Sequence, residues 1–524
     1  MSLIKRISTV GGFTLLSRIF GLARDYLMAR YLGAGMAADA FFIAFKLPNF
    51  FRRLFAEGAF SVGFIPLFSR ALGKDITPES QKAAEAFAGR VLGWLLPVLV
   101  VLLVIMELSM VPVMLGLTGG FDVGSPDSTA KFDLVVELGR YTFPYLLLIS
   151  LVSFLSGMLN AVGRFSAAAF APVLLNILMI SALLMFHETD AQAARYLAGA
   201  VSVSGLVQLI WLYAAARRAG LSVHLPRPRL TDDVRELLRI MGPAAIGAGV
   251  MQINLLADVV IAARMLPEGS VSWLFYADRL AQLPLGVIGI AVGTVLLPGI
   301  SRLLAANDQA GAMVQQNRAL EFSLLMTIPA AAALAVLAEP VIATIFERGA
   351  FDAADSGSTS MALFAYAFGL PAYVIQKALT PAYFARSDTR TPVIYATISL
   401  VMNLILNLIL IQYFAHVGLA AATAIAAWLN VGLLYWGLQA RGHFIADSRT
   451  LTNAVKFVAA SLVMGAALYW AAGQFSFVFA DDGLLRVGGL AVFVIGGAAL
   501  YFAVVLALRG INLREIKASL KKTA

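Results

Sequence analysis

Long apolar stretches constrain the fold of this chain most. A helix that crosses a bilayer needs about 20 mostly apolar residues, and about fourteen such stretches follow one another. Backbone groups inside lipid must be hydrogen-bonded within their own segment, so the sequence predicts an all-α polytopic membrane protein. The approximate bounds of the stretches are 9–31, 38–66, 88–117, 134–158, 167–186, 194–215, 239–262, 272–299, 318–345, 360–384, 393–413, 418–438, 453–473 and 485–508.

Composition supports this fold class and excludes several kinds of site. Of the 524 residues, 60% are hydrophobic and 13% are charged, whereas a soluble domain is about 45–50% apolar and about 25% charged. The chain has no cysteine, which excludes disulfides, thiolate catalysis and cysteine metal ligands. The net charge of +9 is attributed to the bias that keeps basic residues on the cytoplasmic side, and no nucleic-acid partner is expected.

The distribution of charge predicts the topology. Basic residues gather in alternate loops, and with an even number of spans the basic N- and C-terminal segments both lie on the cytoplasmic side. The basic loops contain Arg70, Lys82, Arg164, Arg217, Arg218, Arg227, Arg302, Arg386, Arg390, Arg441 and Arg449. The intervening loops are poor in Lys and Arg. We expect the N-terminal segment to be retained as the first span, because charges interrupt its apolar run.

A short internal repeat predicts two similar halves. Residues 44–70 match residues 277–302, so that Lys46 aligns with Arg279 and Pro66 aligns with Pro298. These segments are spans two and eight, so the halves have the same orientation. The expected architecture is two six-helix lobes related by a parallel pseudo-repeat around a central cavity, with two extra C-terminal helices. The corresponding ranges are 1–220, 221–440 and 441–524.

Charged residues inside the spans are the strongest functional signal. A charge at the bilayer centre costs at least about 2.5 kcal/mol and normally faces a cavity or a partner. In span one, the polar residues fall within an arc of about 120°, and in spans two and eight most of them fall within about 80–100°. The charged residues concerned are Arg18, Arg24, Asp25, Asp39, Lys46, Arg52, Arg53, Glu57, Asp278 and Arg279.

Two interpretations of these charges stay open. Neighbouring opposite charges could be buried ion pairs that serve only assembly, and Asp39 and Lys46 could extend towards the membrane surface. After Asp25, Glu57 and Asp278 are paired, however, Arg18 and Arg52 remain in surplus. Guanidinium groups bind phosphate oxygens in a bidentate manner, so a cavity with surplus arginine favours an anionic ligand.

The remaining polar residues give weaker signals. Asp258, with Asn403 and Asn407, could supply oxygen ligands to a coupling cation, although interhelical hydrogen bonding is the commoner role of such residues. The sequence contains no phosphate-binding loop, no Ser-His-Asp arrangement and no metal-ligand spacing. We therefore expect a protein that is not an enzyme and has no cofactor or metal. Its energy source is left open between the membrane potential and a monovalent cation.

Four segments resemble the MurJ/MviN family of lipid II flippases. They are residues 21–70, residues 143–177, residues 269–298 and YFARSDTRTPV at 383–393. The resemblance implies the fold of the multidrug/oligosaccharidyl-lipid/polysaccharide exporters. It implies that Arg18, Arg24, Arg52 and Arg279 match cavity arginines that bind pyrophosphate, and that Asp25, Asp39 and Asp278 match acidic positions beside them. Gln282 departs from relatives that carry Glu there, so an acidic role is not transferred to it.

The resemblance also implies a substrate and a location. The substrate is lipid II, a disaccharide-pentapeptide on undecaprenyl pyrophosphate, carried across the bacterial inner membrane by alternating access for peptidoglycan synthesis. Membrane lipids and the cell-wall synthesis machinery are the other expected partners. The C-terminal helices are expected to form a groove for the lipid tail. The alternatives are a flippase or exporter of another polyprenyl-linked glycan or amphiphile, a polyprenyl-phosphate glycosyltransferase, and a scaffold that transports nothing.

Overall fold

The described part of the chain is helical throughout its regular structure. A computed structural model describes residues 3–53, 60–73, 75, 77–120, 126–185, 190–480 and 483–511. Glu57 and the basic residues after 511 lie outside this part. Within it, the chain forms helices and contains no strand.

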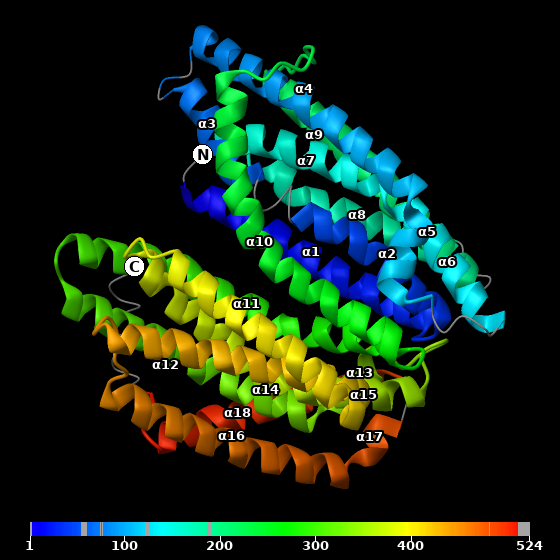
Figure 1. Cartoon of the computed structure of the whole chain (residues 1–524). Helices are drawn as coiled ribbons and strands as arrows, with labels where there is room; N and C mark the ends of the chain where they lie inside the picture. The colour runs from blue at the N-terminus through cyan, green and yellow to red at the C-terminus, as the bar shows by residue number, and fades with distance from the viewer. Residues whose placement is uncertain are drawn as a thin grey trace. The chain divides into compact units, whose positions relative to one another are not determined.

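The helices of the N-terminal half follow the predicted stretches (Figure 1). Two of those stretches, 88–117 and 134–158, are each covered by a pair of consecutive helices, and helices α2 and α3 lie in the stretch 38–66. The bounds are α1 Leu3–Leu32, α2 Met36–Phe51, α3 Phe60–Leu72, α4 Pro78–Leu108, α5 Met110–Thr118, α6 Pro126–Thr142, α7 Pro144–Ala161, α8 Ser166–Met185, α9 Asp190–Arg218 and α10 Asp232–Met265.

The C-terminal half continues the same pattern. Helix α15 covers two predicted spans, and its backbone reverses at Ala415, where φ is 47° and ψ is −130°. A side chain at Gly418 would clash with the Leu410 carbonyl, so the reversal needs a glycine there. The bounds are α11 Ser270–Ala305, α12 Gln309–Val336, α13 Ala338–Phe346, α14 Ala353–Phe384, α15 Arg390–Ala440, α16 Ser448–Gln474, α17 Ser476–Ala480 and α18 Leu484–Ala507.

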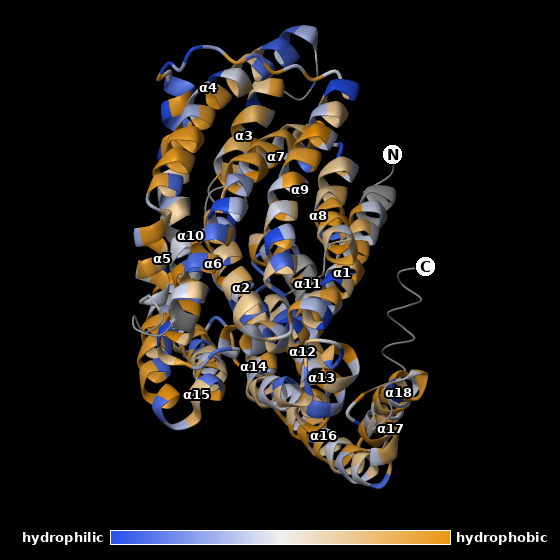
Figure 2. Cartoon of the chain, turned by 90° about the vertical axis from the view of Figure 1, so that its right-hand side faces the viewer, coloured by the Kyte–Doolittle hydropathy of each residue, from blue (hydrophilic) through white to orange (hydrophobic). Residues whose placement is uncertain are grey.

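The helices have the length and hydropathy of membrane spans. Among the described residues, nine helical segments are long and apolar enough to cross a membrane. The 51-residue α15 counts once among them, although it accounts for two predicted spans. Helix α1 is also long enough, but it carries Arg18, Arg24 and Asp25 along its length. Figure 2 shows α4 and α5 as mainly hydrophobic. The polytopic all-α fold class is confirmed.

The chain forms two compact units. The first consists of residues 1–272 together with 348–351, and the second consists of residues 273–347 and 352–524. Helix α10, the seventh predicted span, belongs to the first unit, and α11, the eighth, begins at the boundary. The predicted division at residues 220 and 440 stays a prediction.

Contacts inside the first unit follow the predicted topology. On the basic side, the Gln81 amide donates to the Gly220 carbonyl (2.7 Å), and Arg70 of α3 pairs with Glu236 of α10 (2.9 Å). On the opposite side, the Ala350 N–H donates to the Arg30 carbonyl (2.9 Å). Segments predicted to share a membrane side therefore meet, while the side that faces the cytoplasm remains a prediction.

The second unit is held together by close packing of α14 on α15. The buried Tyr383 hydroxyl donates to the Leu434 carbonyl (2.7 Å). A side chain at Gly437 would approach the hydroxyl groups of Tyr383 and Tyr395, so only glycine lets the helices come this close. Small residues at this contact replace the hydrophobic driving force that helices lack inside lipid.

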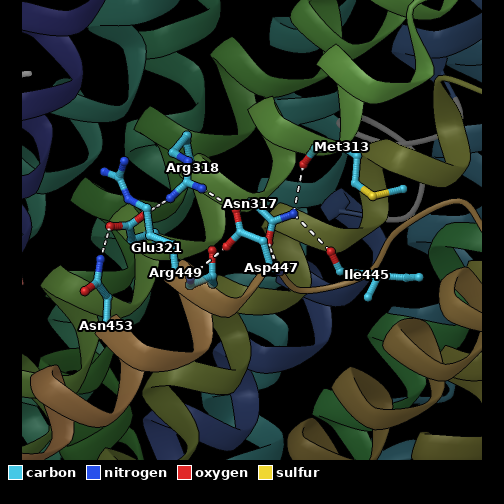
Figure 3. Close-up of polar contacts among 9 residues, drawn as sticks. Met313, Asn317, Arg318, Glu321, Ile445, Asp447, Arg449 and Asn453 are labelled. Carbon is cyan, nitrogen blue, oxygen red and sulfur yellow. Dashed lines mark hydrogen bonds and ion pairs between the residues drawn. The ribbon is translucent and has the colours of Figure 1, made fainter.

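The C-terminal helices α16 and α18 pack on α12. Phe457, Met464 and Tyr501 are buried in this contact, and the Tyr501 hydroxyl donates to the Leu325 carbonyl (2.8 Å). A polar network lies at one end of the contact (Figure 3). Its centre is Glu321, which accepts from Asn453 (2.6 Å) and pairs with Arg449 (3.4 Å).

Arg318 completes this network by linking α12 to the segment before α16. It pairs with Glu321 and with Asp447, which is the N-cap of α16 and accepts from the Thr450 N–H (2.7 Å). The side chain of Asn317 accepts from the Asp447 N–H (2.9 Å). The N-cap of α16 and the charged side chains around it therefore all have partners. These contacts fix the start of α16 against α12.

A loop ion pair should make stability depend on pH. The Thr391 backbone N–H (3.0 Å), together with Arg441 (2.6 Å), lowers the pKa of Asp388 from 3.8 to about 2. A carboxylate whose folded-state pKa is lowered stabilises the fold above its unfolded pKa, and this contribution disappears as pH falls from about 4 to about 2. Asp388→Asn should therefore cost about 1 kcal/mol at neutral pH and progressively less below pH 4.

Thermal unfolding in detergent at pH 6 and pH 3 measures this effect. Asp232→Asn is the matched control, because the Asp232 side chain is fully exposed and its ion pair with Arg235 has a distance of 3.4 Å. The control should unfold like the parent at both pH values. An Asp388→Asn deficit of the same size at pH 6 and pH 3 would contradict the assignment.

Candidate functional site

Arg24 and Asp25 form a buried ion pair on α1. The Arg24 Nε and Nη2 atoms donate to Asp25 Oδ1 at 3.0 and 2.6 Å, and Arg24 and Asp25 are 8% and 0% exposed. The third guanidinium nitrogen donates to Asn176 Oδ1 of α8 (2.9 Å). The Asn176 amide in turn donates to the Ser17 carbonyl (3.0 Å). Arg24 is therefore held in a fixed orientation by a carboxylate and an amide.

Arg18 lies on the same helix in a different environment. Its side chain is half-buried, and it makes no hydrogen bond or ion pair to any residue that the structure describes. Its donors are therefore not used by the described fold. Arg24 is therefore a paired charge, and Arg18 is a surplus charge among the described residues.

Arg52 lies where α2 ends. Its Nε donates to Asn49 Oδ1 (3.1 Å), and the Asn49 amide donates back to the Phe45 carbonyl (3.0 Å). Pro48 lies inside α2, which ends three residues after it, at Phe51. Asn49 and Arg52 thus lie together where the helix ends. Glu57, the acidic residue expected nearby, lies outside the described residues.

Asp39 of α2 is the most heavily bonded of the predicted acidic residues. It is 2% exposed and accepts from the Gly269 N–H (2.8 Å), from the Ser272 N–H (3.0 Å) and from the Ser272 hydroxyl (2.7 Å). Lys131 of α6 adds a charged hydrogen bond (3.2 Å). Asp39 is therefore buried in the protein, and the interpretation that it extends to the membrane surface is wrong. It anchors the start of α11 to the first unit.

A second segment of the C-terminal half is held by the same unit. Residues 348–351 pack against the end of α1, where the Ala350 N–H donates to the Arg30 carbonyl. Gly33 and Gly349 both have φ of 65°, and a side chain on either would meet backbone of the other segment. The first unit therefore holds residues 348–351 and the loop before α11, which contains Gly269. The predicted topology places both on the same side of the membrane as Asp39.

Replacing Asp39 should destabilise the first unit. In Asp39→Asn, the amide nitrogen would face backbone donors, and the buried Lys131 would lose its nearest counter-charge, the other being the exposed Glu268. Breaking one side of a buried pair costs about 3–5 kcal/mol, so we expect a large fall in the thermal unfolding midpoint in detergent. Glu268→Gln is the control, because Glu268 lies 3.9 Å from the same Lys131 but is 55% exposed. Equal effects of the two changes would argue against the anchor.

The second unit carries Asp278 and Arg279 on α11. Both side chains are half-buried. The Arg279 guanidinium lies 5.0 Å from the centre of the Phe275 ring, which stabilises the cation. Gln282 donates a hydrogen bond to Asp278. An ionised glutamate could not donate in this way, which gives the amide at position 282 a physical role of its own.

The residues considered for a coupling cation are divided between the units. Asp258 is half-buried on α10 of the first unit. In the second unit, Asn407 donates to Asn403 (3.2 Å), and Asn403 donates to Thr423 (3.4 Å) across the two halves of α15. These bonds support the interhelical role of the asparagines, and cation coupling stays a prediction. The described residues contain no group of acidic or histidine side chains arranged to hold a metal.

Sequence reasoning missed several partners of the predicted charges. Asn176 and Ser272 are uncharged and could not be separated from ordinary polar residues. Lys131 carried a signal, since it is a basic residue on the side predicted to be poor in Lys and Arg. The sequence analysis singled out the charges of spans one, two and eight, but Glu321 of α12 and Arg486 of α18 are also buried, at 9% and 5% exposed.

Comparison with known proteins identifies the family. Residues 28–482 match the family described as "Lipid II flippase MurJ". The chain belongs to the MurJ family of lipid II flippases. It is 44% identical to the probable lipid II flippase MurJ of Rhizobium meliloti (strain 1021), covering 100% of this chain and 97% of that protein. It is 35% identical to lipid II flippase MurJ of Burkholderia cenocepacia, covering 96% of each.

Solved structures agree with membership of the MurJ family. A structure of lipid II flippase MurJ in an inward closed conformation has a TM-score of 0.78 and 27% identity, covering 95% of this chain and 98% of that one. An inward-facing multidrug resistance transporter of the MATE family has a TM-score of 0.68 at 16% identity and covers 83% of this chain and 97% of its own. The second likeness shows the shared fold alone. The MurJ family is a transporter family, and this chain shares its fold with the MATE transporter.

Proposed function

We propose that this chain translocates lipid II from the inner to the outer leaflet of the bacterial inner membrane by alternating access. The match to the MurJ family over nearly the whole chain carries this proposal. The charged residues inside the spans supply the chemistry, because a diphosphate needs cationic donors at bilayer depth. The apolar helices support a multi-pass membrane protein, and the positive-inside bias supports termini on the cytoplasmic side.

Arg18, Arg24, Arg52 and Arg279 are the residues to which we assign the pyrophosphate. Arg18 forms no hydrogen bond or ion pair with the described residues, and the guanidinium of Arg279 lies on the Phe275 ring. Arg24 is different, because Asp25 and Asn176 occupy its guanidinium. A phosphate could bind the Nε and Nη2 edge of Arg24 by replacing the Asp25 carboxylate, which has the same charge and similar oxygen geometry. In this proposal, Asp25 holds Arg24 in position while the site is empty.

The C-terminal helices are assigned to the lipid tail. Helix α16 packs on α12 through one side, while its other side exposes Leu462, Tyr469 and Trp470 at 65–75% of their surface. On α18, Val492 and Ile495 are similarly exposed. Large apolar side chains that are exposed to this extent are suited to contact with lipid chains. A polyprenyl tail can therefore remain in an apolar environment while the headgroup crosses.

Neutralising the arginines should abolish transport without preventing insertion. In a strain depleted of its own flippase, we expect Arg24→Ala, Arg52→Ala and Arg279→Ala each to lower the amount of lipid II accessible on the outer leaflet at least about tenfold, because each removes charge-assisted hydrogen bonds worth about 1.5–3 kcal/mol. Lysine at the same positions should restore only part of the activity, since it lacks the bidentate geometry.

Arg217→Ala is the control for these variants. Arg217 is an exposed arginine at the end of α9, so its loss removes the same charge away from the assigned site. Membrane insertion of every variant is checked by immunoblotting of membrane fractions. Full activity in all three site variants would remove the arginines from the mechanism. If the variants export lipid II normally but no longer export another polyprenyl-linked glycan, that glycan becomes the proposed substrate.

The membrane potential is the proposed energy source. An interior-negative potential favours return of an empty, positively charged site to the cytoplasmic side, and moving one charge across 100 mV is worth about 2.3 kcal/mol. Collapsing the potential in proteoliposomes should therefore slow repeated turnover. The measurement is lipid II transport with and without an ionophore, with sodium present or replaced by potassium. If turnover is unchanged without a membrane potential but strictly requires sodium, the cation is the energy source.

A further inference from the structure

A cavity separate from the charged residues of the spans opens at one end of the first unit. It has a volume of about 410 Å³ and lies among the end of α7, the start of α8 and the end of α9. Leu159, Phe165, Trp211 and Ala215 supply much of its apolar lining. Its size is within the range of about 300–1,000 Å³ that is usual for small-molecule sites.

Two arginines, Arg164 and Arg218, also line this cavity. Both are exposed, and neither forms a side-chain hydrogen bond or ion pair with any residue in the described part of the chain. They lie in the turn after α7 and at the last residue of α9. The cavity therefore combines an apolar lining with unused guanidinium groups from two separate segments.

Local structure keeps the cavity open and adds further donors. The Trp211 Nε1 atom donates to the Ala167 carbonyl (3.1 Å), and the Trp211 ring packs against Phe170 with ring centres 5.4 Å apart. Ser166 and Ala167 are the first residues of α8 and also line the cavity. The first N–H groups of a helix lack intrahelical acceptors and favour an anion.

The predicted position of the cavity relative to the membrane restricts the kind of ligand that can bind there. The cavity lies where three helical segments end or begin, in a loop region predicted to be cytoplasmic, and tryptophan is typical of the membrane–water interface. A ligand there meets headgroups on one side and acyl chains on the other. Charge complementarity to Arg164 and Arg218 requires a negatively charged headgroup, and basic pockets between membrane helices on this side bind such lipids.

We propose that this cavity binds one anionic glycerophospholipid of the cytoplasmic leaflet. Its phosphate lies between Arg164 and Arg218 near the start of α8, and the upper part of an acyl chain covers Leu159 and Trp211. The lipid is a structural ligand of the first unit and is not transported. This inference does not depend on the substrate assigned above.

Lipid binding to the purified full-length chain tests the proposal. Native mass spectrometry measures the apparent affinity of the first bound lipid during titration with dioleoyl phosphatidylglycerol or dioleoyl phosphatidylcholine, which have identical acyl chains. We expect the parent to prefer phosphatidylglycerol about 30-fold, because each basic side chain near an anionic headgroup contributes about a factor of five. Arg164→Gln/Arg218→Gln should lose this preference.

Two further variants separate the cavity from general surface charge. Arg217→Gln/Arg227→Gln removes the same charge from exposed neighbours that do not line the cavity, and it should keep the preference. Ala215→Trp keeps both arginines but fills the cavity, and it should weaken phosphatidylglycerol binding. In a parallel thermal unfolding measurement, phosphatidylglycerol should raise the midpoint of the parent and of the arginine control only.

Several results would overturn the proposal. One is an unchanged preference in Arg164→Gln/Arg218→Gln, and another is an equal loss in the Arg217→Gln/Arg227→Gln control. If the double glutamine variant does not fold, Arg164→Lys/Arg218→Lys retains the charge and should keep a reduced preference, and its complete loss would also count against the site. Displacement of phosphatidylglycerol by undecaprenyl pyrophosphate at similar concentration would instead make the cavity part of the transport path.

Discussion

The cost of placing charge inside a bilayer governs the rest of this structure. Each ionised side chain within a span needs a partner, a water-filled space or a ligand. Arg24 meets this requirement with Asp25 and with Asn176 of another helix. Asp39 meets it with Lys131 and with backbone donors of the segment before α11. These contacts join helices that are distant in the sequence, so the charges that are costly in lipid also determine which segments are held together.

The arginines of the assigned site differ in how their guanidinium groups are paired, and this difference explains how the site could bind a diphosphate. A binding site for a diphosphate must hold cations ready without letting them collapse onto fixed carboxylates. Arg18 is unused in the described fold, and Arg279 is stabilised by an aromatic face. Arg24 is compensated by an adjacent carboxylate that a phosphate could replace. A site of this kind can exist without ligand at a tolerable cost and still favour an anion when one arrives.

Hydrophobic patterning predicted the helical spans well because it depends on the solvent around each segment. The stretch 418–438 and the stretch 393–413 were separated correctly, although the structure joins them in α15 with a reversal at Ala415. Interruptions within single stretches were not predicted, because breaks such as the one between α4 and α5 leave the hydropathy unchanged. The polar junction at Glu321 also escaped notice, since its partners Arg449 and Asn453 lie on α16, more than a hundred residues away in the sequence.

The sequence by itself determined that this is a polytopic membrane protein, and it predicted which loops share a side and which arginines lie at bilayer depth. These properties depend on composition and periodicity, which each segment carries independently. Only the tertiary structure decided that Arg24 is paired and Arg18 is not, that Asp39 is buried against Ser272, and that Arg164 and Arg218 border one cavity. Such facts depend on which distant segments meet, and side-chain pairing across helices leaves no mark within either segment alone.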